Sequence, residues 1–154
     1  MKKSSILPCV IGLGYVGLPI LVRLAKKFKV KGFDISNERI QFLKNKVDIN
    51  NEIDQVLLNK KIVNSISSKI NDCKKSNFFI LCIPTPVSKN KKPDLRKLLN
   101  ACKSLSKILK KDDIVFIEST VYPGVTNDIC EKLLSKNNNL IPGKDFYLGY
   151  SPER

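Results

Sequence analysis

Short apolar runs alternate with segments of helical periodicity from one end of this chain to the other. Strands are expected at 6–11, 30–33, 78–83, 114–117 and 146–150, with a weaker candidate at 61–66. Helices are expected at 18–28, after Ser36, at 94–109 and at 125–134. Strands that alternate with helices are typical of a mostly parallel sheet with helices on both faces. The pattern therefore predicts one doubly wound α/β domain over residues 1–154.

Several residues mark where these elements should begin and end. Ser36 is a suitable N-cap for the helix that follows it, and Thr126 is expected to cap the helix at 125–134. Pro84 should end the strand at 78–83, because proline has no N–H to donate and restricts the residue before it.

Three glycines follow the first predicted strand at the spacing Gly12-x-Gly14-x-x-Gly17, directly before a helix. Gly12 permits a tight turn, Gly14 lets the backbone approach a pyrophosphate, and Gly17 lets the helix pack closely on the strand. The start of the helix offers unpaired N–H groups and the positive end of its dipole to an anion. This pattern predicts a dinucleotide site in a Rossmann-type domain, with a chance glycine-rich turn as the alternative.

Asp34 ends the second predicted strand, seventeen residues after Gly17. A carboxylate at this position can accept hydrogen bonds from both hydroxyls of an adenosine ribose, and it would repel a 2′-phosphate. Strand, glycines, helix, strand and acid in this order therefore predict NAD as the cofactor in preference to NADP.

Polar residues also follow the later strands, and ligands of open α/β sheets bind beyond the carboxyl ends of the strands. Thr85 lies between two prolines after one strand, Thr120 follows the next, and Glu153 follows the last. The threonine hydroxyls could contact a ribose, a phosphate or a water, and Glu153 could act as a base. Either threonine alone could equally be a cap or turn residue. Their shared edge of the sheet favours a site.

The charge balance changes this interpretation little. The chain carries 28 Lys and Arg against 14 Asp and Glu, a formal net charge of +14. The basic residues are scattered, dense only at 89–92, and do not alternate with aromatic residues that would stack on bases. A nucleic-acid partner is therefore not expected. No apolar run approaches the roughly 20 residues of a membrane span, so no membrane association is expected either.

Three residue types, histidine, cysteine and tyrosine, narrow the possible chemistry and location. The chain contains no histidine, which excludes histidine acid–base catalysis and histidine-containing zinc sites within these residues, and no metal site is predicted. The five cysteines are odd in number and show no Cys-x-x-Cys spacing, which favours a reducing cytoplasm over a disulfide framework. None of the four tyrosines has a lysine four positions later, which argues against a short-chain dehydrogenase.

Five motifs in order carry a resemblance to a known family. They are Gly-Leu-Gly-Tyr-Val-Gly-Leu-Pro at 12–19, Phe-Asp at 33–34, Ile-Pro-Thr-Pro at 83–86, Glu-Ser-Thr-Val-Tyr-Pro-Gly at 118–124 and Tyr-Ser-Pro-Glu-Arg at 150–154. Over essentially its whole length, the chain resembles the N-terminal NAD-binding domain of the UDP-glucose/GDP-mannose dehydrogenase family. The last two motifs are closer to the UDP-N-acetylhexosamine 6-dehydrogenases within that family.

The resemblance implies an enzyme that oxidises the C6 alcohol of a UDP-sugar to a carboxylate for surface polysaccharide biosynthesis. Such an enzyme uses two NAD and an enzyme-bound thioester, and it is expected to be a homodimer. By the same resemblance, Asp34 holds the adenosine ribose and Arg39 lies beside the adenine. Thr120 would lie near the nicotinamide and help to hold a catalytic water, and Glu153 matches the general base. The other implied cofactor residues are Gly12, Gly14, Tyr15, Val16, Gly17, Pro84 and Thr85.

The chain ends at Arg154, whereas the family's nucleophilic cysteine, central dimerising helix and UDP-binding domain lie further on. None of the five cysteines is therefore assigned the nucleophile's role, and the 154 residues alone are expected to be inactive. Two alternatives stay open. A β-hydroxyacid dehydrogenase of the 6-phosphogluconate type shares the N-terminal fold, although the motifs at 118–124 and 150–154 argue against it. A stand-alone NAD-binding or interaction module would have no catalysis of its own.

Overall fold

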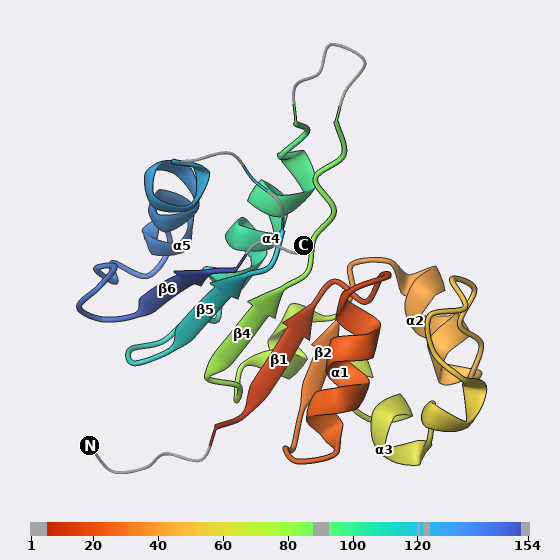
Figure 1. The fold of residues 1–154 in the computed structure, drawn as a ribbon. Coiled ribbons are helices and arrows are strands. Elements are labelled where there is room, and N and C mark those ends of the chain that lie inside the picture. The colour runs from red at the N-terminus through yellow and green to blue at the C-terminus, as the bar shows by residue number, and fades with distance from the viewer. Residues whose placement is uncertain (1–5, 88–92, 120, 122–123, 152–154) are drawn as a thin grey trace.

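Six parallel strands form a single sheet in the order β3-β2-β1-β4-β5-β6 (Figure 1). The computed structural model describes residues 6–87, 93–119, 121 and 124–151. The order reverses direction between β1 and β4, which confirms the predicted doubly wound fold of Rossmann type. The strands are β1 (Pro8–Ile11), β2 (Lys31–Phe33), β3 (Ile66–Ser67), β4 (Phe78–Leu81), β5 (Ile114–Ile117) and β6 (Tyr147–Tyr150).

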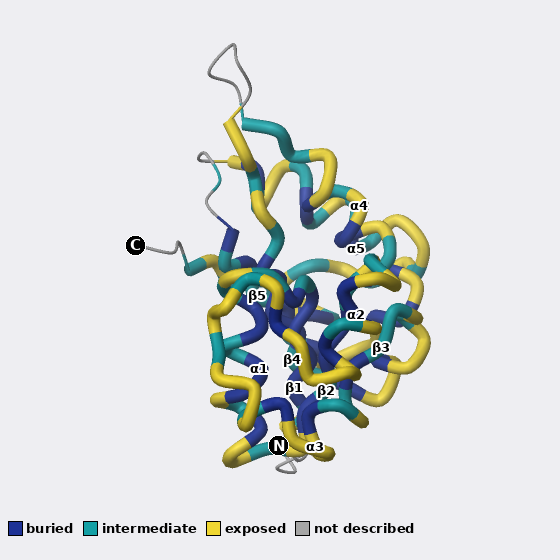
Figure 2. Tube along the Cα trace, turned by 90° about the vertical axis from the view of Figure 1, so that its right-hand side faces the viewer, coloured by how far each residue is buried: buried dark blue, intermediate teal, exposed yellow. Residues whose placement is uncertain are grey.

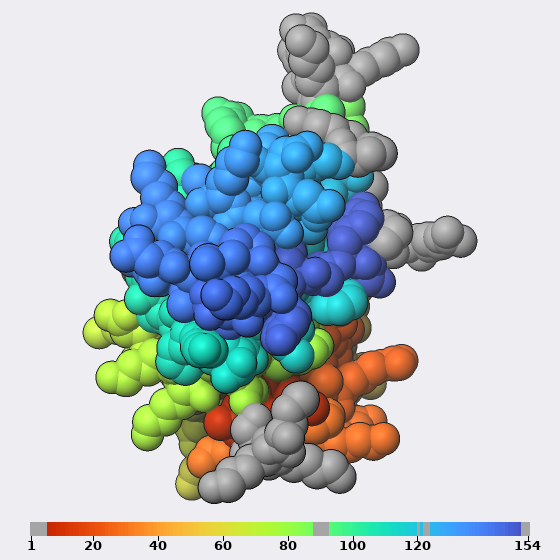
Figure 3. Space-filling model, turned by 90° about the vertical axis from the view of Figure 1, so that its left-hand side faces the viewer, coloured from red at the N-terminus to blue at the C-terminus, as the bar shows by residue number. Residues whose placement is uncertain are grey.

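Helices cover both faces of the sheet, as predicted. The face that α1 covers also receives α2 and α3, and the opposite face is covered by α4 and α5 (Figure 1). At the β6 end, α5 and β6 form one side of the molecule, drawn in blue in Figure 3. The helices are α1 (Gly17–Ala25), α2 (Asn37–Lys44), α3 (Lys60–Val63), α4 (Arg96–Leu105) and α5 (Glu131–Ser135), with the 3-10 turns η1 (Gln55–Leu57) and η2 (Ile70–Cys73) and the π-helix η3 (Val125–Cys130).

A separate hydrophobic cluster fills each side of the sheet. Leu21 and Leu43 belong to the cluster on the α1 side, and Phe79 and Leu98 belong to the cluster on the α4 side. The central strands β1 and β4 are almost entirely buried, and Figure 2 shows a dark blue centre surrounded by exposed loops, whereas the edge strand β6 has no buried residue. Continuous apolar strands are expected in a parallel sheet covered on both faces. In the described part of the chain, no helix combines the length and the apolar character needed to span a bilayer.

The weak strand predicted at 61–66 is wrong for most of its length. Residues Lys60–Val63 form α3, and the Asn59 side chain caps this helix by accepting the N–H groups of Lys61 and Ile62. Only Ile66, of the predicted range, pairs with β2. The short apolar segment is compatible with either element, and the N-cap asparagine favours the helix.

The two predicted helix caps have different outcomes. Ser36 caps α2 as predicted, because its Oγ accepts the N–H of Arg39 at 3.1 Å. Thr126 is not a cap. It lies inside η3, which begins after Gly124 without a capping side chain. Gly124 has a φ of +95°, a conformation that glycine adopts at little cost, and this turn sets the start of the helical segment.

Candidate cofactor-binding site

The carboxyl ends of four strands meet at one edge of the sheet. The N–H groups of Gly12, Cys82, Glu118 and Ser151 each donate to the last residue of a neighbouring strand, at 2.8, 2.8, 3.0 and 3.0 Å. The segments that follow β1, β4, β5 and β6 therefore leave the sheet at the same level. This is the edge at which the sequence predicts a site.

The glycine turn between β1 and α1 has the close packing that its spacing predicts. A Cβ on Gly12, whose φ is +91°, would lie 2.5 Å from the carbonyl oxygen of Cys82. A Cβ on Gly17 would lie 1.8 Å from the carbonyl oxygen of Gly12. At Gly14, in contrast, a Cβ would meet no heavy atom within 4 Å. The turn is therefore packed tightly at Gly12 and Gly17 and open at Gly14.

The start of α1 is suited to an anion. Its N-cap, Val16, provides no side-chain hydrogen bond, and the first turn contains no acidic residue. The N–H groups there are not neutralised by the helix's own side chains, so the dipole end can act on a phosphate group.

Asp34 is held by two hydrogen bonds, one to the glycine turn and one to the N-cap residue of α2. Its Oδ2 accepts the N–H of Leu13 at 2.8 Å, and its Oδ1 accepts the N–H of Ser36 at 2.9 Å. A carboxylate has about four acceptor positions, so two remain for the hydroxyls of a ribose.

Arg39 also holds the glycine turn, through a hydrogen bond to Leu13. Its guanidinium is 8% exposed, its Nε donates to the carbonyl oxygen of Leu13 at 2.9 Å, and its Nη2 lies 2.8 Å from Oδ1 of Asp48. Burial acts to raise the pKa of Asp48, but hydrogen bonds from Arg39 and from the N–H groups of Glu52 and Asn50 outweigh it and hold the pKa below its usual value. Arg39 thus links the glycine turn to a buried ion pair. Its contact with adenine remains a prediction.

Two cavities meet at the glycine turn. The first, of about 350 Å³, extends from Asp34 to α4, and the second, of about 420 Å³, extends from Tyr15 to the end of β5. Gly14, Cys82, Ile83 and Pro84 line both. The first is also lined by Ile11, Gly12, Phe33, Asp34, Ile35, Ser36, Lys97, Asn100, Ala101 and Ser104, and the second by Tyr15, Val16, Thr85, Pro86, Glu118 and Ser119.

This shape fits a dinucleotide. NAD consists of two nucleosides joined by a pyrophosphate, and here two cavities join beside Gly14 and the start of α1. The predicted role of Asp34 would place the adenosine half in the first cavity and the nicotinamide half in the second, beside Thr85 and the end of β5. These placements remain predictions.

Most predicted cofactor residues therefore come together at this edge. Gly17 lines neither cavity and packs against Gly12 within the turn. Thr120 and Glu153, the predicted catalytic residues, lie outside the described residues. Within the described ranges, no group of three or more histidine, cysteine or acidic residues could hold a metal ion.

Two contributions to the site were not predicted, namely the hydrogen bonds of Ser119 and one face of α4. Ser119 connects the ends of β4 and β5, because its Oγ donates to the carbonyl oxygen of Ile83 at 2.6 Å and accepts the N–H of Ile83 at 3.2 Å. The other is the face of α4 that lines the first cavity. It carries a signal in the sequence, since its four residues, Lys97, Asn100, Ala101 and Ser104, have helical spacing and form a second stripe beside the apolar one.

The chain is similar to a group of sugar-nucleotide dehydrogenases. The family model described as "UDP-glucose/GDP-mannose dehydrogenase family, NAD binding domain" matches residues 7–154. The chain is 48% identical over 145 residues to Protein CapL of Staphylococcus aureus and 46% identical over 145 residues to a UDP-N-acetyl-D-glucosamine 6-dehydrogenase of Pseudomonas aeruginosa. Each alignment covers 94% of this chain and 34% of the relative.

A solved structure shows the same fold. The UDP-D-ManNAc dehydrogenase of Pyrococcus horikoshii superimposes with a TM-score of 0.86 at 34% identity, over 97% of this chain and 36% of that one. The present chain thus spans about a third of the length of the relatives that it matches.

Proposed function

Because this chain belongs to the UDP-glucose/GDP-mannose dehydrogenase family and matches its NAD-binding domain over residues 7–154, we propose that the complete protein is a UDP-N-acetylhexosamine 6-dehydrogenase. The observation that carries the proposal is the two-part cavity centred on Gly14, in a chain 46% identical to a UDP-N-acetyl-D-glucosamine 6-dehydrogenase. The substrate would be a UDP-N-acetylhexosamine, with UDP-glucose as the alternative. The family match also favours this enzyme over a β-hydroxyacid dehydrogenase.

The described residues bind and orient the cofactor in this proposal. Asp34 holds the adenosine ribose, Gly14 and the start of α1 hold the pyrophosphate, and Val16 and Thr85 line the nicotinamide half. NAD, when bound, supplies the acceptor for the hydride that leaves C6. Oxidation of an alcohol to a carboxylate releases two hydrides and consumes one water, so the reaction needs two NAD for each sugar.

Glu153 and Thr120 have the catalytic roles in this proposal. Glu153 removes a proton as the general base, and Thr120 positions the water near the nicotinamide. Support comes from Ser119 and Ser151, their described neighbours in the sequence, because both follow strands at the edge that carries the cavities.

The remaining two thirds of the enzyme, in the proposal, supply the nucleophilic cysteine, the UDP-binding domain and a homodimer contact. A cytoplasmic location is supported by the five cysteines, which are all buried and form no disulfide. Catalysis would then require the complete protein, and the 154 residues alone would bind NAD without oxidising a sugar.

The test is NADH formation by the full-length protein with UDP-N-acetylglucosamine, UDP-N-acetylgalactosamine and UDP-glucose. Glu153→Gln should leave the dissociation constant for NAD unchanged and reduce turnover by roughly 10²–10⁴-fold, the usual contribution of a general base. Thr120→Ala should act in the same direction less severely. If both variants kept normal turnover but lost affinity for NAD, Glu153 and Thr120 would be cofactor contacts and not catalytic residues. No oxidation of any UDP-sugar would favour the stand-alone NAD-binding module.

A further inference from the structure

One face of α4 lines the first cavity, and none of the roles described so far involves this face. Lys97, Asn100, Ala101 and Ser104 line the cavity from α4 at the spacing i, i+3, i+4 and i+7. Residues at this spacing form one stripe along a helix. The neighbouring apolar stripe, which includes Leu98, is buried on the sheet and accounts for the packing of α4. Ala101 also belongs to the buried cluster, whereas the polar residues of the cavity-lining stripe, Lys97, Asn100 and Ser104, are not buried and are available to a ligand.

The opposite wall presents an apolar side chain to the same cavity. Ile35 directly follows Asp34, lines the first cavity and is 77% exposed. Ala101 on α4 is small and 9% exposed. Ile35 and Ala101 thus supply aliphatic surfaces on the two elements that bound the cavity. A flat ring with apolar faces fits such a space.

In the proposed function, on which this inference rests, Asp34 binds the ribose. That role determines which part of the cofactor lies between Ile35 and α4. The 2′-hydroxyl that Asp34 would hold is on the ribose carbon next to the one that carries the base. The base therefore enters the first cavity, between the turn after β2 and α4, since both elements line it.

We propose that Asn100 recognises the adenine base of NAD and that Ile35 packs on its ring. An asparagine amide carries an acceptor and two donors. On one edge adenine presents its amino donor beside the N7 acceptor, a pair that an asparagine side chain can meet with two hydrogen bonds. A base with an oxygen in place of the amino group cannot donate the first of these bonds. The α4 wall thus selects the base, whereas Asp34 selects the unphosphorylated ribose.

The test compares NAD with nicotinamide hypoxanthine dinucleotide, in which an oxygen replaces the adenine amino group. Dissociation constants would be measured by calorimetry on wild-type protein, Asn100→Ala and a control, Lys103→Ala, which changes an exposed residue of α4 outside the cavity lining. Wild-type protein should prefer NAD by about 5- to 30-fold, as one or two net hydrogen bonds predict. Asn100→Ala should reduce the preference to less than about twofold, and Lys103→Ala should retain it.

Ile35→Ser separates ring packing from base recognition. Because Ile35 is largely exposed, its replacement should leave the thermal midpoint unchanged. Both dinucleotides should then bind several-fold more weakly, with their ratio unchanged. Unchanged affinity in Ile35→Ser, or a full NAD preference in Asn100→Ala, would overturn the inference. If wild-type protein bound the two dinucleotides equally, only the inference about adenine recognition would be overturned. If it bound neither, the cofactor role of the domain would be overturned as well.

Discussion

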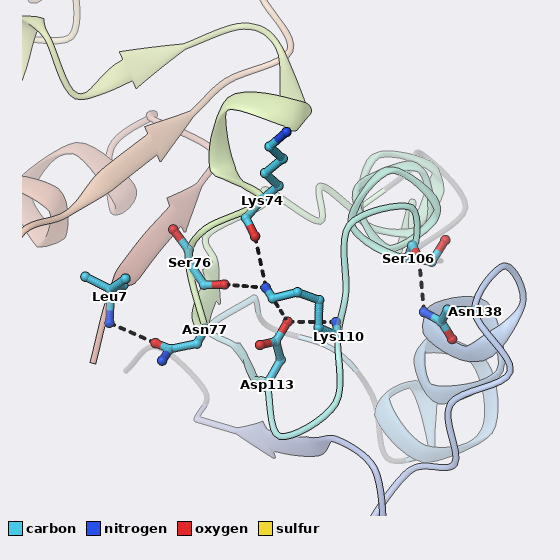
Figure 4. Close-up of polar contacts among 8 residues, drawn as sticks. All are labelled: Leu7, Lys74, Ser76, Asn77, Ser106, Lys110, Asp113 and Asn138. Atoms are coloured by element: carbon cyan, nitrogen blue, oxygen red, sulfur yellow. Dashed lines mark hydrogen bonds and ion pairs between the residues drawn. The ribbon is translucent and has the colours of Figure 1, made fainter. Parts of the chain in front are cut away.

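The same strands form two edges of the sheet that are built in different ways. At the carboxyl edge, Gly14 faces open space, the start of α1 has no capping side chain, and two cavities join. At the amino edge, the loops that lead into the strands hydrogen-bond to one another (Figure 4). Both edges use hydrogen bonds within the protein, but the carboxyl edge also has two cavities and a helix start without a capping side chain.

Lys110 is the centre of the amino edge. Its Nζ donates to the carbonyl oxygens of Lys74 and Ser76 at 3.0 and 2.9 Å and lies 3.3 Å from Oδ2 of Asp113 (Figure 4). Asp113, which is 1% exposed, also accepts the N–H of Lys110 at 2.8 Å. These bonds join the loops before β4 and β5. The comparison suggests that changes at the carboxyl edge should alter affinity, and changes at the amino edge should alter stability.

The largest expected effect is on cofactor affinity and comes from Gly14→Val. The Cβ of the new side chain would meet no heavy atom within 4 Å. The thermal midpoint should therefore stay within about 2 °C of wild type, since a change of 1 kcal/mol would shift it by roughly that much or more. Pyrophosphate contacts should be lost, and two charge-assisted hydrogen bonds correspond to about 100-fold or more in affinity. Calorimetric titration with NAD measures this. Wild-type affinity in the variant would show that the pyrophosphate does not approach Gly14.

Asp34→Ala should lower both cofactor affinity and stability, because this residue holds the glycine turn and is proposed to bind the ribose. NAD affinity should fall by about 10- to 100-fold, and the preference for NAD over NADP should narrow as repulsion of the 2′-phosphate is lost. Stability should also decrease, since the N–H groups of Leu13 and Ser36 lose their acceptor. Titrations with both cofactors, paired with a thermal melt, test this. Equal or tighter NADP binding by wild-type protein would contradict the role of Asp34.

At the amino edge, Asp113→Ala should lower stability and leave NAD affinity within twofold of wild type. Removal of the carboxylate leaves the N–H of Lys110 without its acceptor, at a cost of about 1–3 kcal/mol, which urea unfolding can measure. Asp112→Asn is the matched control, because it removes one negative charge from an exposed neighbour. A weakened NAD affinity in Asp113→Ala would break the division between the two edges.

The smallest expected effect is on the pH dependence of stability, and its sign differs between the edges. The lowered pKa of Asp48 means that its stabilising contribution is present above the unfolded-state value of about 3.9 and is lost as the pH falls through the folded-state pKa. Burial raises the pKa of Asp113, and contacts with Lys110 offset this only in part. Its contribution is therefore present at low pH and is lost as the pH rises through the raised pKa.

Thermal melts between pH 3 and pH 7 can separate the two carboxyl groups. On acidification, the stability difference between wild type and Asp48→Asn should shrink. Over the same range, wild type should gain stability relative to Asp113→Asn. Parallel curves for wild type and both variants would contradict the pKa directions and the linkage argued from them.

The sequence predicts a structural feature well when the pattern that specifies it lies within a short stretch of residues. β5 was predicted at its observed bounds, and Asp34 was placed beside the glycine turn, because strand length and glycine spacing are local patterns. The range 61–66 was wrong because a short apolar run does not distinguish a strand from a helix. The cavity-lining face of α4, which includes Asn100, was not predicted for another reason. A polar residue on a helix gains a binding role only from the strand and turn that pack opposite it, and periodicity does not show that packing.

Leu13 indicates how the cofactor would meet this turn. Its N–H donates to Asp34 and its carbonyl oxygen accepts from Arg39, so both polar groups of one buried residue are held by side chains from beyond β2. A turn held in this way is preorganised, and little conformational entropy remains to be lost when a ligand is bound. Association would then not wait for the loop to rearrange, and differences in affinity among variants of this turn should arise in how long NAD stays bound.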